Sequence, residues 1–293
     1  MSKENSARLK LLTSMVIYGT VSLFVKNISL PSAAISMYRG FIGAPFLLLV
    51  MLVTRKKISL TAIKKNLLPL VAAGAMLGLN WMLLFEAYKY TSVATSTLCY
   101  YVSPVFLIVA SVFIFNEKLT VKKVLCVLAA LAGMMLISGF LEENSVGGNQ
   151  LKGILLALAA ALLYAGIVIV NKGLKDISPY ERTVAQLLAS SLVMLVYNLF
   201  SGNLQSAPLD GTGLLLLAVL GIVHTGFAYY LFFGSTADLS AQSLAIIGYV
   251  DPVVAVLISA FIFREGMGIA DVIGAVLIIG AAIISELPSK EKG

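Results

Sequence analysis

Charged residues are scarce in this chain. Only 12% of its 293 residues are Asp, Glu, Lys or Arg, and 59% are hydrophobic. An ordinary soluble domain carries roughly 25% charged residues. A water-soluble fold of this length would lack polar surface, so the composition excludes one and indicates an integral membrane protein.

The residues that carry most enzyme chemistry are equally scarce. The chain has one histidine, His224, and two cysteines, Cys99 and Cys126, which both fall inside apolar runs. Such cysteines indicate neither a disulfide framework nor a thiolate metal site. No GxSxG, HExxH or P-loop pattern is present. We therefore expect no enzyme, no cofactor and no bound metal.

Long apolar runs are what the chain does have. Runs of roughly 17 to 25 residues, the length that crosses the ~30 Å hydrocarbon layer as a helix, recur along nearly all of it. Polar or helix-breaking residues separate the runs. Ten spans are predicted, at residues 10–28, 32–53, 67–88, 92–115, 121–140, 151–171, 180–201, 213–235, 240–263 and 268–286.

The net charge of +7 sits in short clusters between these spans, which is typical of membrane topology rather than of nucleic-acid binding. Sixteen basic residues fall on the side of the N-terminus: Lys3, Arg8, Lys10, Arg55, Lys56, Lys57, Lys64, Lys65, Lys118, Lys122, Lys123, Lys172, Lys175, Arg182, Lys290 and Lys292. The other side has Lys26, Lys89, Lys152 and Arg264. The positive-inside rule places both termini in the cytoplasm of a multi-pass protein in a bacterial-type cell (inner) membrane.

An internal repeat is visible at a shift of 148 residues. It aligns Tyr101–Glu117 with Tyr249–Glu265, and nine of these 17 positions are identical. A shift of 146 also pairs Tyr18 with Tyr164. Because each half has an odd number of spans, the second half is expected upside down relative to the first. The predicted fold is an all-α membrane protein of ten transmembrane helices in two inverted five-helix repeats, 1–140 and 151–286, followed by a cytoplasmic tail, 287–293.

The chain resembles the drug/metabolite transporter superfamily, and more closely its ten-helix EamA-type members, over essentially its full length. The resemblance rests on the duplicated segments Pro104–Glu117 and Pro252–Glu265, the run from Phe85 to Val93, and Arg39 early in the second span. It implies a secondary transporter with a central cavity between the halves, handling amino acids, amines or other metabolites.

Asp251 lies halfway along the ninth span, directly before Pro252. A bare carboxylate at the bilayer centre costs roughly 2.5 kcal/mol or more unless it is paired or hydrated. The first repeat has Ser103 at the equivalent place, so the repeat as such does not require the acid. Related transporters often carry an acid here, usually Glu. We expect either a substrate-cation or proton site, or an acid paired structurally with another helix.

Arg39 lies about seven residues into the second span, roughly 10 Å from its end at 1.5 Å per residue. Its side chain can extend outward to the interface, pair with Glu86 or Asp251, or contact an anionic substrate group. The sequence leaves these alternatives open.

Aromatic residues with polar tips recur at repeat-related places. The pairs are Tyr18 with Tyr164, Trp81 with Tyr229, and Tyr101 with Tyr249, and Asn80 is a further polar candidate. Buried Tyr and Trp need partners for their polar atoms, so these residues either line a shared cavity or pack between helices. Aromatic faces with one carboxylate suit a positively charged amine.

For three more ionisable residues, the sequence allows two roles each. His224 either relays protons or is simply hydrogen-bonded. Glu117 and Glu265, at helix ends on opposite membrane faces, are expected as gate or structural residues.

The sequence therefore predicts transport of an amino acid or amine by alternating access. Export of other metabolites or drugs, or a channel-like facilitator, is the alternative. The expected partners are a small-molecule substrate and membrane lipid, without nucleic acid. Small residues in 129–133 and 274–282 suit close helix contacts, either inside a monomer or in a homodimer.

Overall fold

The computed structural model describes residues 2–25, 27–55, 58–87, 90, 96, 99–137, 150–202, 210–261 and 268–286. The helices of the first half are α1 (Lys3–Gly19), α2 (Val21–Val25), α3 (Ser32–Val53), α4 (Leu60–Lys65), α5 (Leu67–Ala87), α7 (Ser103–Ile114) and α8 (Val121–Ile137). Those of the second half are α9 (Gln150–Gly173), α10 (Pro179–Ser201), α11 (Gly211–Val219), the π-helical turn η2 (Leu220–Phe227), α12 (Ala228–Ser235), α13 (Ala241–Gly248), α14 (Val250–Phe261) and α15 (Ile269–Glu286).

Several of these helices are long and apolar enough to cross a membrane. Within the described ranges they are Ala33–Val53, Leu67–Leu84, Gln150–Gly173, Pro179–Ser201 and Gly211–Ser235. Shorter apolar helices cover Ser103–Ile114, Ala241–Val254 and Val272–Ala281. Each of the ten predicted spans overlaps one helix or a run of consecutive helices in the described residues, although the first part of the span predicted at 92–115 lies largely outside them. The all-α class is confirmed.

The polar residues between spans begin the helices that follow them. Ser178 caps α10 with a complete capping box, in which the Glu181 side chain bonds back to the Ser178 backbone N–H. Asp210 caps α11, and Ser240 caps α13. These side chains satisfy backbone N–H groups that have no partner inside the helix.

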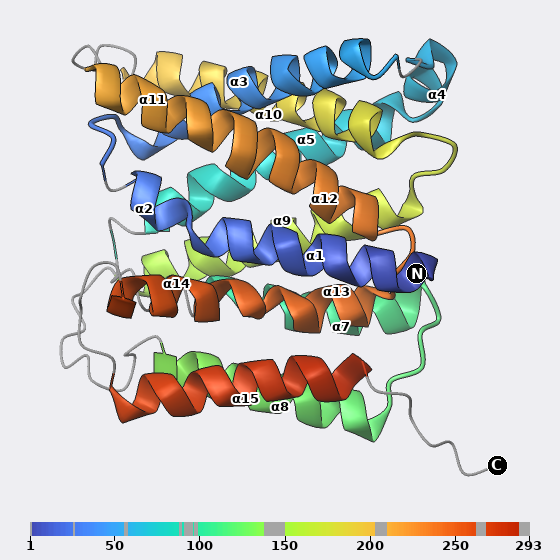
Figure 1. The fold of residues 1–293 in the computed structure, drawn as a ribbon, viewed down its shortest axis with the longest axis vertical. Coiled ribbons are helices and arrows are strands. Elements are labelled where there is room, and N and C mark those ends of the chain that lie inside the picture. The colour runs from blue at the N-terminus through green and yellow to red at the C-terminus, as the bar shows by residue number, and fades with distance from the viewer. Residues whose placement is uncertain are drawn as a thin grey trace.

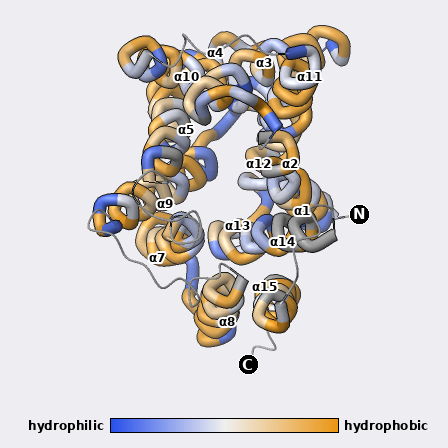
Figure 2. Tube along the Cα trace, turned by 90° about the vertical axis from the view of Figure 1, so that its left-hand side faces the viewer, coloured by the Kyte–Doolittle hydropathy of each residue, from blue (hydrophilic) through white to orange (hydrophobic). Residues whose placement is uncertain are grey.

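The helices form two columns when viewed along their axes (Figure 2). One column holds α10, α5, α9, α7 and α8, and the other holds α3, α11 with α12, α1, α13 with α14, and α15. Each helix therefore faces its counterpart from the other repeat. Within each column, most neighbouring helices come from different repeats. In the first column α5 packs on α9 and α10, and in the second column α12 packs on α1 and η2 packs on α3. Both columns are mixtures of the two halves.

The counterparts run in opposite directions, as an inverted repeat requires. Asn198, near the end of α10, donates a hydrogen bond of 3.0 Å to the carbonyl of Ala33 at the start of α3. At the other ends of these helices, the N–H of Ser59, in the segment after α3, donates to the carboxylate of Glu181 in the first turn of α10. The side at which α1 begins is also the side at which α15 ends (Figure 1).

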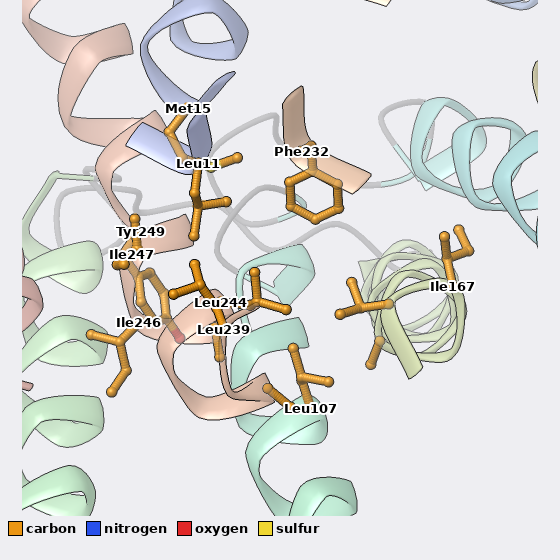
Figure 3. Close-up of a cluster of buried hydrophobic side chains, with 14 of the residues drawn as sticks. Leu11, Met15, Leu107, Ile167, Phe232, Leu239, Leu244, Ile246, Ile247 and Tyr249 are labelled. Atoms are coloured by element: carbon orange, nitrogen blue, oxygen red, sulfur yellow. The ribbon is translucent and has the colours of Figure 1, made fainter. Parts of the chain in front are cut away.

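The largest buried cluster lies between the columns and joins both halves. Leu11 and Met15 of α1 gather with Phe232 of α12 and Leu244 of α13 (Figure 3). This packing fixes the walls of the cavity described next.

Candidate functional site

The helices that carry the duplicated Tyr-Val-x-Pro segment are interrupted at equivalent points. In the second half, α13 ends at Gly248 and α14 begins at Val250. In the first half, α7 begins at Ser103, after a turn in which the Val102 N–H bonds to the Cys99 carbonyl. The prolines explain these breaks, because a proline has no N–H to continue the helical ladder.

A cavity of about 140 Å³ lies between the two breaks. One wall is formed by Tyr100, Tyr101 and Ser103, and the opposite wall by Gly248 and Asp251. Other lining residues are Tyr18 of α1, Tyr164 of α9, Tyr229 and Phe232 of α12, and Leu244 of α13. Both halves therefore contribute to one cavity.

Six of the fifteen described residues that line the cavity are aromatic, and their rings contact one another. The Tyr18 and Tyr229 ring centroids are 5.4 Å apart, and Tyr100 lies 5.9 Å from both Tyr101 and Tyr164. Phe232 closes the set, 6.1 Å from Tyr164. Ring faces of this kind attract cations.

Asp251 is the one ionisable acid among the described lining residues. The Tyr101 side chain lines the cavity together with it. Ser103, its counterpart in the first repeat, lines the same cavity. The cavity is thus symmetric in backbone and asymmetric in charge.

Tyr100 is a lining residue that sequence reasoning missed. Its counterpart at a shift of 148 is Gly248, which also lines the cavity. A Tyr–Gly mismatch hides the relationship from a search for matching aromatics. The repeat register itself contained the signal, because both residues directly precede the duplicated Tyr-Val-x-Pro segment.

Arg39 lies outside the cavity lining, with its guanidinium directed at α5 and η2. Its Nε donates to Thr225 Oγ1 at 2.9 Å, and its Cζ lies 5.2 Å from the Trp81 ring centroid. The Trp81 ring is 6.1 Å from that of Tyr229, which lines the cavity. Arg39 therefore touches the cavity wall through Trp81 and forms no ion pair with Asp251.

Two predicted residues support the cavity from behind. The Tyr249 hydroxyl donates to the Tyr101 carbonyl at 2.9 Å, and its side chain is fully buried. Asn80 donates to the Ala160 carbonyl at 2.6 Å, which joins α5 to α9.

His224 is placed away from the cavity, inside η2. Its Nε2 lies 2.8 Å from Thr20 Oγ1, its Nδ1 lies 3.4 Å from the Val219 carbonyl, and its ring packs on Phe24. These contacts connect η2 to the end of α1.

Glu117 joins the two halves at the side where α1 begins. Its carboxylate accepts hydrogen bonds from the N–H groups of Ala241 and Gln242, in the first turn of α13. Lys172 lies 3.9 Å from this carboxylate and donates to the Leu239 carbonyl. We call Glu117, Lys172 and the first turn of α13 the Glu117 latch. Glu86 is half-buried in the last turn of α5, and Glu265 lies outside the described residues.

Comparison with known proteins agrees with this architecture. The EamA-like transporter family matches residues 5–139 and 151–286. The uncharacterized transporter YxxF of Bacillus subtilis (strain 168) is 29% identical over 97% of this chain and 90% of its own length. An uncharacterized transporter of Archaeoglobus fulgidus is 27% identical over 93% of both chains.

A solved structure, titled "Crystal structure of protein", has a TM-score of 0.84 at 20% identity and covers 96% of this chain and 98% of that one. At this identity the likeness shows the fold alone. The family matches cover nearly all of both repeats, so the chain belongs to the EamA-like transporter family.

Proposed function

We propose that this membrane transporter carries an amino acid or amine by alternating access through the cavity between its halves. The observation that carries the proposal is a cavity with tyrosine rings on several sides and one carboxylate, Asp251. A protonated amine gains both ion pairing and cation–π attraction in such a site. Neutral sugars would gain neither.

The cavity volume narrows the substrate class. A protein cavity of about 150 Å³ holds a molecule the size of benzene, and this one measures about 140 Å³. We infer that substrates are compact, with an ammonium group beside Asp251. Bulky drug-like cations would require a larger cavity.

The Glu117 latch favours a carrier over a channel-like facilitator. Two hydrogen bonds and a nearby lysine join the end of α7 to the start of α13, and we propose that they close this side of the cavity. Alternating access requires such a closure to form and break on each side in turn. Glu265 is proposed as the corresponding residue of the other side.

A thermal-shift screen of the detergent-purified protein against amino acids, amines and quaternary ammonium compounds tests the site. We expect stabilisation by small amines in wild type and its loss in Asp251→Asn. This substitution keeps the size of the side chain and removes its charge, so it isolates the carboxylate. Stabilisation by neutral or anionic compounds alone would reject the cation chemistry.

Proton coupling through Asp251 is a separate proposal. Uptake into proteoliposomes should then depend on an imposed pH gradient, and Asp251→Asn should remove that dependence. Exchange that is independent of pH and survives Asp251→Asn would reject the coupling.

We also propose that both termini face the cytoplasm. The support is the excess of basic residues on the side where α1 begins. A C-terminal green fluorescent protein fusion should fluoresce, and a C-terminal alkaline phosphatase fusion should be inactive. The reverse pattern would invert the topology.

A further inference from the structure

The helices α8 and α15 form a pair at one end of the molecule, beside α7 and α13 (Figure 2). They meet most closely at Gly133, where an added Cβ would lie 2.6 Å from the Gly274 carbonyl oxygen. Toward the beginning of α8 the two helices enclose an open groove of about 580 Å³. We call this space the α8–α15 groove.

The floor and rim of the groove differ in a way that suits a lipid chain. Small residues line its floor, including Ala129 on α8 and Gly280 and Ala281 on α15. The rim residues Leu125 and Val276 are 60% and 65% exposed, as expected of side chains that face hydrocarbon. The groove is therefore a concave apolar channel that opens toward the bilayer.

Charge distinguishes one end of the groove. Lys122 is its one charged lining residue. Lys122 is on the side of the protein where most of the basic residues are found. A ligand that complements the groove has an apolar chain of several methylene groups and an anionic group at that end.

We propose that the α8–α15 groove binds one acyl chain of an anionic phospholipid, with the headgroup phosphate at Lys122. The apolar walls take the chain and the basic end selects the headgroup. A basic residue near a membrane surface contributes about fivefold to affinity for an anionic lipid. This site is independent of the Asp251 cavity and of the substrate proposed for it.

Native mass spectrometry of the full chain in detergent tests the proposal with dioleoyl phosphatidylglycerol and dioleoyl phosphatidylcholine as probes. We expect the wild type to retain phosphatidylglycerol in preference to phosphatidylcholine. In Lys122→Gln, the ratio of retained phosphatidylglycerol to phosphatidylcholine should fall about fivefold. The matched control is Lys123→Gln, since Lys123 lies on the same helix but does not line the groove. It should behave as wild type.

A second variant distinguishes binding of the lipid acyl chain from binding of the lipid headgroup. An added side chain at Gly280 meets no atom within 4 Å, so Gly280→Leu should fold and fill part of the groove. It should reduce retention of both lipids about equally. Equal retention of both lipids that neither variant alters would overturn the proposal. A dimer without bound lipid that Gly280→Leu dissociates would instead assign the groove to a second copy of the chain.

Discussion

The Tyr249 hydroxyl donates a hydrogen bond to the carbonyl oxygen of Tyr101, its own counterpart in the other repeat, at 2.9 Å. The Tyr101 side chain, in contrast, lines the cavity that also contains Asp251. One duplicated tyrosine thus holds the two helix breaks together, while the other lines the cavity.

The two tyrosines should separate stability from binding. Tyr249→Phe removes a buried hydrogen bond and should lower stability by about 1 kcal/mol, with substrate preference unchanged. Tyr101→Phe removes a hydroxyl group from the cavity that contains Asp251, and it should change amine affinity and its pH dependence more than the unfolding temperature. Thermal unfolding and ligand-induced shifts, measured on both variants, check this. Identical effects of the two substitutions would contradict the division of roles.

Filling the cavity should abolish binding without unfolding the protein. A Cβ at Gly248 meets no atom within 4 Å, and the residue lines the cavity. Gly248→Leu should therefore lower the affinity for amines by at least about tenfold, as measured by ligand-induced thermal shifts, because one leucine side chain occupies most of so small a cavity. The control is Gly173→Leu at the end of α9, which also has open space around its Cβ. Undiminished binding in Gly248→Leu would place the substrate elsewhere.

Arg39 should act on the cavity indirectly. Arg39→Lys keeps the charge but loses the planar group that stacks on Trp81 and bonds to Thr225. We expect a lower unfolding temperature and a modest change in amine affinity, far smaller than that of Asp251→Asn. Isothermal titration with a compact amine and its carboxylate-bearing analogue checks this. Selective loss of the carboxylate-bearing compound would make Arg39 a direct substrate contact.

Breaking the Glu117 latch should open one side of the cavity. Glu117→Gln weakens the charged acceptor at the start of α13, a contribution of about 1 kcal/mol. The thiol introduced by Leu244→Cys, in a background without Cys99 and Cys126, should then react faster with a membrane-impermeant maleimide added to that side. Lys118→Gln, the adjacent position, is the control. An unchanged rate in folded Glu117→Gln protein would remove the latch from the gating scheme.

The contact between α8 and α15 should tolerate almost no added volume. Gly133→Ala places a methyl group against the Gly274 carbonyl and should cost about 1 to 3 kcal/mol, the range found for overpacked cores. Gly280→Ala, on the facing helix, has open space and should leave the unfolding temperature near that of wild type. Thermal unfolding in one detergent compares them, and equal stability of the two variants would argue against this close crossing.

Much of the fold was predictable because hydrocarbon thickness fixes span length and the repeat fixes helix direction. The meeting of Tyr18, Tyr164, Tyr229 and Asp251 also follows the repeat. Other features depend on packing between distant helices. The π-helical turn that holds Thr225 is one of them, since the corresponding stretch of α5 is regular α-helix. The orientation of Arg39 toward Trp81 depends on that turn and has no local sequence signal.

The difference between Ser103 and Asp251 makes the two repeat-related sides of the cavity unequal in charge. With identical halves, the inward-open and outward-open states would be related by a two-fold rotation and equal in energy, and a substrate could bind in either of two orientations. One carboxylate on one side of the pseudo-two-fold axis removes that degeneracy. In the proposed mechanism, a bound cation would therefore be held in a single orientation, and loading and release would occur from two states of different energy.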